Sequence, residues 1–380
     1  MRCLLSSLVL LLAVVVGAIS WFVLHIKHSP RRFLNGGVDP DHGCACTDTH
    51  HTPHTCLSLS NSLPYFFSLS VAERLARYRT LHANENPRTL HGFDYDAVEF
   101  AGEEGALRGW LVHGAPPPGG RNTTVIFSPG AGSTILVEPL RALPLFHAYA
   151  NVLALDTASV GGSDGDNGVG FGTREYRDVL AAVEFVRARD PTSRIVLAGH
   201  SAGASASIHA STEIMVSGAA GGRIDGVIAS SVFASFEEEA ARVLVAGVFR
   251  SKIPASIRGL VDALVGERVA RLLAAAVHLI SWSHGEWLRE PRDSLERAAA
   301  VANADPRKMQ LLIIHGGDDA LVHVDNVHRL ARATASGSKV EVSSCIVDGG
   351  SHKFSQLWSK PTSCIPHSLQ RFFAAVAQHE

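Results

Sequence analysis

The sequence predicts an α/β protein with a mostly parallel sheet that is covered by helices on both faces. Short continuous apolar runs, typical of strands buried on both faces, alternate with segments of helical periodicity. Apolar residues make up 46% of the 380 residues and charged residues only 18%, which excludes a disordered chain and provides a large core. The 34 glycines suit many tight turns between strands and helices.

The strands and helices are expected in alternation along the chain. The stretch 97–112 alternates around glycines and predicts an antiparallel hairpin at a sheet edge. Further strands are expected at 124–127, 151–155, 194–198, 225–229, 309–314 and 339–347. Helices are expected at 176–189, 205–217, 324–334 and 367–378.

Charge and cysteine content exclude two other classes. Lys+Arg 34 against Asp+Glu 36 gives a net charge of -2, whereas nucleic-acid binding needs concentrated positive charge. Six cysteines are too few for a disulfide scaffold, although Cys345 and Cys364 could pair in an oxidising lumen.

The N-terminus is expected to anchor the protein in a membrane. The run from Leu4 to Ile26 holds no Asp, Glu, Lys or Arg and is long enough to span a hydrocarbon core of ~30 Å. A cleaved signal peptide is the alternative, because small residues near Ala18 and Ser20 would suit a cleavage site. We therefore expect an anchor or signal peptide at 1–27, a juxtamembrane linker at 28–90 and the main domain at 91–380.

Two features of the sequence disagree on which side of the membrane the main domain lies. Charges flanking the anchor slightly favour a cytosolic domain, whereas the glycosylation sequon at Asn122 would be modified only in a lumen. An endomembrane such as the endoplasmic reticulum is expected in either case. The Cys- and His-rich segment 42–56 is either a metal site or a polar linker, and its spacing matches no known zinc module.

An insert without strands is expected at about 234–305. It is helical in character, and its stretch 258–282 is very apolar for a surface segment. Such a helical cap either packs against the core or lines an apolar substrate pocket.

The nucleophile of an acyl-transfer enzyme is predicted at Ser201. Gly199-His200-Ser201-Ala202-Gly203 fits G-x-S-x-G, with a strand before it and a small-residue helix after it. In such an elbow the serine hydroxyl is pushed above the sheet edge on a tight turn, while the helix N-terminus favours developing negative charge. His200 is expected to be structural.

A serine hydroxyl needs a base and an acid, which on this type of fold follow it in the chain. After the strand at 309–314, either Asp318 or Asp319 could orient the base. Among the later histidines only His352 directly follows a strand, on a glycine-rich loop. The glycine-rich loop 128–133 and the Ala202 N–H could stabilise an oxyanion.

These motifs, GHSAG, HGGDDALV and GGSHK, resemble those of the membrane-anchored α/β-hydrolase-domain lipases, especially the monoacylglycerol and lysophosphatidylserine lipase group. The resemblance runs from about Phe93 to the end of the chain. It implies an eight-stranded sheet, an N-terminal anchor, no cofactor, and the triad Ser201, Asp319 and His352.

The chain departs from this family at two motifs. The usual HGNAG is here Ser128-Pro-Gly-Ala-Gly132, which leaves the oxyanion donor open between Gly130 and Ala131. The usual DYRGYGxS is here Asp156-Thr-Ala-Ser-Val-Gly-Gly-Ser163, which lacks the arginine.

The sequence thus predicts a membrane-anchored serine hydrolase that cleaves acyl lipid esters, monoacylglycerol or lysophospholipid, through an acyl-enzyme. The alternatives are an acyl-protein thioesterase or peptidase on the same fold, and a catalytically silent binding module.

Overall fold

A computed structural model of the chain describes residues 38–39, 44–46, 56–58, 79–80, 82–114, 122–165, 169–218, 223–244, 289–301, 308–334, 339–358 and 363–378. The predicted anchor at 1–27, most of the Cys- and His-rich segment and the central part of the expected cap lie outside these residues. Within the described residues, no helix combines the length and apolar character needed to span a bilayer. No group of three or more His, Cys, Asp and Glu side chains in that part of the chain could hold a metal ion.

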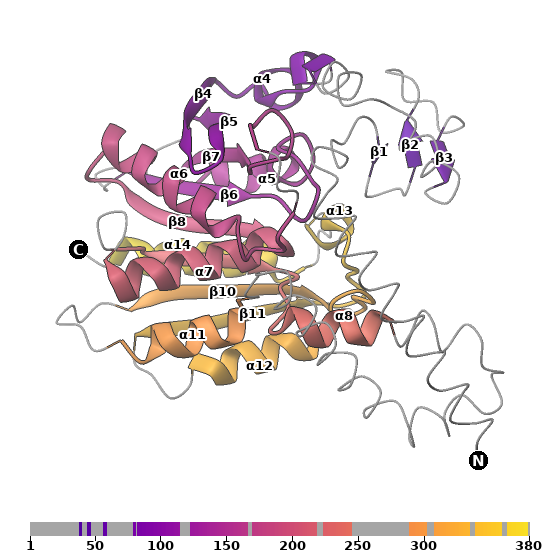
Figure 1. The fold of residues 1–380 in the computed structure, drawn as a ribbon, viewed down its shortest axis with the longest axis vertical. Helices are drawn as coiled ribbons and strands as arrows, with labels where there is room; N and C mark the ends of the chain where they lie inside the picture. Colours follow the sequence, from indigo (N-terminus) through magenta and orange to yellow (C-terminus); the bar gives the residue numbers. More distant parts are fainter. Residues whose placement is uncertain are drawn as a thin grey trace.

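An eight-stranded sheet forms the centre of the molecule, in the order β11-β10-β9-β8-β6-β7-β5-β4 (Figure 1). Its strands are β4 (Tyr95–Gly102), β5 (Gly105–Val112), β6 (Thr123–Ser128), β7 (Asn151–Asp156), β8 (Arg194–His200), β9 (Gly226–Ser230), β10 (Met309–Gly316) and β11 (Val340–Val347). Strand β5 is antiparallel to both of its neighbours, and every other pairing is parallel. The predicted α/β class, the edge hairpin and the eight strands are therefore confirmed.

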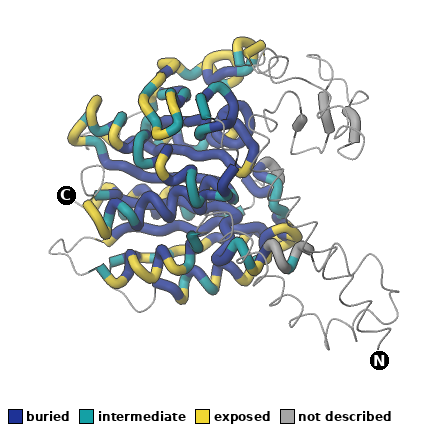
Figure 2. Tube along the Cα trace, in the orientation of Figure 1, coloured by how far each residue is buried: buried dark blue, intermediate teal, exposed yellow. Residues whose placement is uncertain are grey.

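The central strands are buried on both faces, which explains their continuous apolar sequences. In β6, Ile126 belongs to the apolar cluster on one face, whereas Val125 and Phe127 belong to the cluster on the other. Because successive side chains of a strand point to opposite faces, one apolar run supplies both layers of the core. Figure 2 shows this buried interior along the strands and the inward sides of the helices.

Helices cover both faces of the sheet. One face is covered by α6 (Tyr176–Arg189), α7 (Ala202–Ser217), α11 (Pro291–Ala299) and α12 (Asp325–Thr334). The other is covered by α5 (Glu138–His147), α13 (Phe354–Trp358) and α14 (Ile365–Gln378). The described residues also form α4 (Pro87–His91), α8 (Phe236–Leu244) and a small antiparallel sheet of β1 (Val38–Asp39), β2 (Cys44–Cys46) and β3 (Cys56–Ser58).

The C-terminal end of the expected cap belongs to the main core. Helix α11 packs against α7 and α12, and its Leu295 and Ala298 side chains are fully buried. This part of the insert therefore packs against the core. A cap over the remaining stretch, 245–288, stays a prediction that falls outside the described residues.

A disulfide joins Cys345 in β11 to Cys364 just before α14, with a Cα–Cα distance of 5.7 Å. The two cysteines are 19 residues apart, and the segment between them carries His352. Closing a loop of this size restricts the unfolded chain more than the folded one, so the bond stabilises the native state.

We predict that the Cys364→Ser variant unfolds at a temperature several degrees lower than the wild type, because a cross-link of this span contributes about 3 kcal/mol. Scanning calorimetry with and without dithiothreitol checks this. The Cys364→Ser variant serves as the control for effects of the reductant that do not involve this disulfide. The reductant should lower the melting temperature of the wild type but not of Cys364→Ser. An identical melting temperature for reduced and oxidised wild type would contradict the prediction.

Candidate active site

Ser201 lies on the tight turn between β8 and α7, as the motif predicts. Its backbone has φ 51° and ψ −114°, a conformation that residues other than glycine rarely adopt. The Ser201 N–H donates to the Ser230 carbonyl at 2.8 Å, and the Ser201 carbonyl accepts the Ser205 N–H at 3.1 Å. The turn is thus held from β9 on one side and from the first turn of α7 on the other. Because α7 begins directly at the elbow, its start lies three residues before the expected residue 205.

Glycines flank the turn because no side chain fits there. A Cβ atom at Gly203 would clash with the carbonyl oxygens of Ser128 and Pro129. A Cβ atom at Gly199 would clash with the Gly203 backbone. The backbone of the elbow therefore lies directly against the loop that follows β6.

Asp319 emerges after β10 and is the aspartate that meets the predicted base. Its Oδ2 atom lies 2.8 Å from His352 Nδ1, while its Oδ1 atom accepts the N–H groups of Leu321 and Val322 at 3.0 and 2.8 Å. The Asp319 side chain is fully buried, whereas Asp318 is exposed. The two candidates are thereby distinguished by burial and by contact with His352.

The environment of Asp319 keeps its carboxyl ionised. Burial alone would raise its pKa, but the hydrogen bond and charge of His352, together with the Val322 amide, lower the pKa below the ordinary value. An ionised carboxylate only accepts hydrogen bonds, so His352 Nδ1 carries the proton in this contact. The Nε2 atom of a neutral His352 ring is then free to accept a proton.

His352 lies in the loop after β11, beside the elbow. Its side chain is 20% exposed, and its ring centroid is 5.1 Å from that of His200, the residue before Ser201. The structure thus brings the loops that carry Ser201, Asp319 and His352 to one edge of the sheet, at the carboxyl ends of β8, β10 and β11.

Two further histidines support this arrangement. The buried His200 ring bonds through Nδ1 to the Ser230 hydroxyl at 2.8 Å, and burial lowers its pKa well below the ordinary value. The His315 Nε2 atom bonds to the Val322 carbonyl at 2.9 Å, and burial lowers the pKa of this ring as well. Both rings are therefore neutral structural groups, as expected for His200.

The loop after β6 contains the predicted oxyanion donors. The Gly130 N–H donates to Glu138 Oε2 at 3.0 Å, so this donor already has a partner. Ala131 is exposed on the same turn, which is closed by the Ser133 N–H and the Gly130 carbonyl at 3.0 Å. Ala202 is the first residue of α7, so its N–H has no carbonyl within the helix to bind. The bond between Gly130 and Glu138 leaves Ala131 as the remaining candidate of the two for the second donor.

Sequence reasoning missed Glu138, which is buried at the start of α5. Burial raises its pKa to about 7, although the neighbouring Ser133 hydroxyl, the Gly130 amide and the charge of His352 each lower it in part. An acidic residue at the start of a helix is normally explained by its favourable interaction with the positive end of the helix dipole, and it does not by itself suggest a role in a site. Its position shortly after the glycine-rich loop was the available signal.

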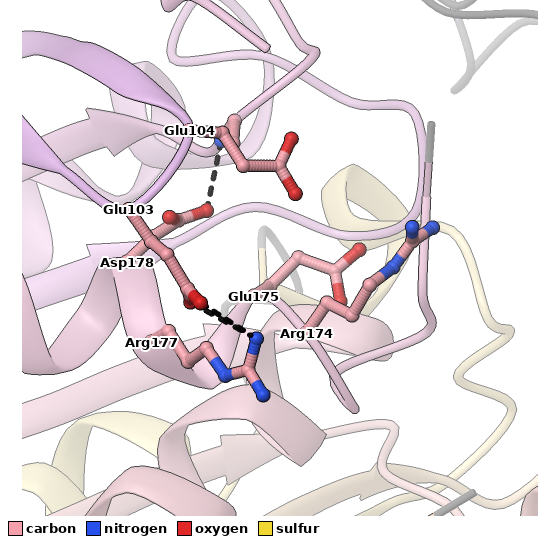
Figure 3. A pocket seen from close by; sticks show the side chains of 7 residues that line it. Glu103, Glu104, Arg174, Glu175, Arg177 and Asp178 are labelled. Carbon is pink, nitrogen blue, oxygen red and sulfur yellow. Dashed lines mark hydrogen bonds and ion pairs between the residues drawn. The ribbon is translucent and has the colours of Figure 1, made fainter. Parts of the chain in front are cut away.

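A separate hollow lies between the β4–β5 turn, the start of α6 and the segment after β7 (Figure 3). Three of its four carboxyl groups have partners within the network: Glu103 pairs with Arg177 at 3.0 Å, Glu175 accepts the amides of Gly170 and Gly172, and Asp178 accepts that of Ala158. The fourth, Glu104, has one buried oxygen without a hydrogen-bond partner among the described residues. The lining of the hollow contains none of the predicted site residues, and we interpret it as a structural network that holds the loop before α6.

Comparison with solved structures supports the fold. An esterase from Pyrococcus furiosus has a TM-score of 0.54 and 22% identity, covering 77% of this chain and 94% of the esterase. DcsB, solved in complex with its substrate analogue, has a TM-score of 0.50 and 15% identity, covering 74% of this chain and 99% of DcsB. At these identities the likeness concerns the fold alone. Comparison with curated protein sequences returns no significant match.

A family model described as serine aminopeptidase, S33, matches residues 121–355. The matched region contains the elbow, the loop after β10 and the loop after β11. Because the match spans more than half of the chain, the protein belongs to the serine aminopeptidase S33 family and is a serine hydrolase with the α/β-hydrolase fold.

Proposed function

We propose that the protein hydrolyses carboxylic esters of acyl lipids through a Ser201–His352–Asp319 triad. The observation that carries the proposal is the 2.8 Å contact between His352 Nδ1 and the buried Asp319 carboxylate, beside the strained turn of Ser201. A strained serine, a neighbouring imidazole and a buried acid are the groups that acyl transfer by a serine hydrolase needs.

The proposed reaction proceeds through an acyl-enzyme. His352 Nε2 takes the proton of the Ser201 hydroxyl while Oγ attacks the ester carbonyl, and Asp319 stabilises the imidazolium. The N–H groups of Ala202 and Ala131 bind the oxyanion. His352 then gives the proton to the leaving alcohol. Water, activated by the same ring, releases the fatty acid and restores the serine.

The lipid substrate is inferred from the sequence around the domain. The charge-free run from Leu4 to Ile26 would hold the enzyme at a bilayer, and the apolar stretch 258–282 would suit contact with an acyl chain. Monoacylglycerol and lysophospholipid are the lipid classes that the resemblance implies.

A peptidase is the second candidate, because the family model that matches the chain is described as a serine aminopeptidase. The same triad could cleave an amide, with the amine as leaving group. The two candidates differ only in what binds around the triad.

We further propose that the domain faces an oxidising lumen. The Cys345–Cys364 disulfide would persist in such a compartment but not in the cytosol. Asn122, which begins the glycosylation sequon, is exposed at the start of β6. These observations outweigh the small charge difference across the predicted anchor.

We predict that Ser201→Ala lowers turnover of an acyl ester by ~10⁴–10⁶-fold, because the nucleophile is lost. A fluorophosphonate probe should label the wild type and not this variant. Ser217→Ala, at the exposed end of α7, is the matched control and should behave like the wild type. Turnover of Ser201→Ala within tenfold of the wild type would refute the proposed nucleophile.

Substrate class is tested on the purified protein with monoacylglycerol, lysophospholipid, an acyl-peptide thioester and an aminoacyl anilide. The proposal expects the highest kcat/KM for one of the two lipids. A higher value for the anilide would favour the peptidase, and a higher value for the thioester would favour an acyl-protein thioesterase.

The two aspartates after β10 provide a matched pair. We predict that Asp319→Asn lowers kcat by ~10³–10⁴-fold, because the amide no longer holds the required tautomer of His352. Asp318→Asn should leave kcat within about threefold, because Asp318 is exposed and its bond to Gly350 comes from its backbone N–H, which the substitution keeps. Equal effects of the two substitutions on ester turnover would argue against Asp319 as the acid.

Lumenal placement predicts that the protein loses mass on treatment with peptide N-glycosidase and that Asn122→Gln shows no such shift. In intact microsomes the domain should resist added protease until detergent is present. Digestion without detergent, together with an unshifted wild-type band, would place the domain in the cytosol.

A further inference from the structure

Glu138 is a buried carboxyl group beside the predicted site that the triad does not use. The residue is 6% exposed and is the first residue of α5. Its Oε2 atom accepts the Gly130 N–H at 3.0 Å. This contact spans the whole turn between β6 and α5, so it connects the helix to the residue that precedes Ala131.

The turn held by Glu138 lies against the elbow. The carbonyl groups of Ser128 and Pro129 leave no room for a side chain at Gly203. A Cβ atom at Gly130 would lie 3.4 Å from the His200 carbonyl oxygen and 3.2 Å from Glu138 Oε1. Gly130 is therefore packed between the residue before Ser201 and the carboxyl group of Glu138.

Oxyanion stabilisation depends on fixed donors, and few side-chain hydrogen bonds hold this turn. Within the turn, the Ser133 N–H binds the Gly130 carbonyl at 3.0 Å, but Ala131 itself is exposed. The next anchor is the Ile135 N–H, which binds Asp156 Oδ1 at 2.8 Å. The bond from Gly130 to Glu138 is thus the side-chain contact closest to Ala131.

We propose that Glu138 is a positioning residue of the active site: by binding the Gly130 N–H, it fixes the turn so that the Ala131 N–H serves, with that of Ala202, as an oxyanion donor. The inference rests on the proposed triad mechanism. It assigns Gly130 a structural bond and Ala131 the catalytic one, and it extends the site to the start of α5.

The role requires an acceptor oxygen, not a full charge. The pKa of about 7 makes the neutral acid and the carboxylate both accessible near neutral pH, and each has an oxygen that can accept an amide hydrogen. Glutamine has the same length and retains such an oxygen. Methionine has a similar length and no comparable acceptor.

The test compares steady-state kinetics of Glu138→Gln and Glu138→Met with an acyl ester that the wild type cleaves. Glu138→Met should lower kcat by at least about tenfold with KM within about threefold, because a misplaced oxyanion donor weakens binding of the transition state only. Glu138→Gln should recover most of this loss. Glu184→Met, at an exposed position of α6, is the matched control and should match the wild type.

Equal kcat values for Glu138→Met and the wild type would overturn the inference, as would equal losses for the Gln and Met variants. If Glu138→Met does not fold, Ala131→Pro decides, because it deletes the proposed donor on an exposed turn. An unchanged kcat in Ala131→Pro would overturn the assignment, and a loss of at least about tenfold in kcat alone would support it. Ser201→Ala measured in parallel distinguishes failure of the Glu138 inference from failure of the proposed function. An active Ser201→Ala refutes the proposed function itself.

Discussion

The geometry of the site depends on one strained residue, Ser201. A positive φ at a residue with a side chain costs ~1–3 kcal/mol, so the surrounding structure must compensate for it. Compensation comes from backbone bonds to Ser230 and Ser205 and from the close approach of Gly203 to the loop after β6. All of these contacts are between main-chain atoms of neighbouring strands, their loops and the first turn of α7. The serine can be held above the sheet edge only because β6, β8 and β9 lie side by side in register.

The acid and the base form a second unit, which is held by strands β10 and β11. Strands β10 and β11 pair in parallel, and the pairing continues into their loops through bonds from Gly317 to Val347 and from Asp318 to Gly350. This continuation fixes Asp319 and His352 relative to each other, and the His352 ring also lies 5.1 Å from that of His200 in the elbow. The Cys345–Cys364 disulfide closes the segment that carries the histidine. The site is therefore the junction of two backbone-bonded units at one edge of the sheet.

Most of the fold was predictable because the central strands bury both faces and therefore have continuous apolar sequences. The motif around Ser201 was also predictable, since glycine is required where backbones touch. The choice between Asp318 and Asp319 was not predictable from spacing, because it depends on which side chain turns inward. Helices α4 and α13 escaped prediction because five residues each are too few for a clear periodicity, and α5 because Pro144 lies inside it. Glu138 was missed because its partner is a backbone amide, and its position shortly after the glycine-rich loop is a weak signal in the sequence.

The charges around the site follow from burial. His200 and His315 are buried and remain neutral, whereas Asp319 stays ionised because His352 and two amides face it. In the proposed mechanism the imidazolium that forms on His352 has Asp319 as its partner, and the oxyanion has neutral amide donors. A fully ionised Glu138 beside those donors would repel the oxyanion. Its burial, which raises the pKa to about 7, reduces this repulsion while the hydrogen bond to Gly130 is kept. The same desolvation that makes a buried carboxyl costly thus makes Glu138 compatible with a site in which negative charge develops.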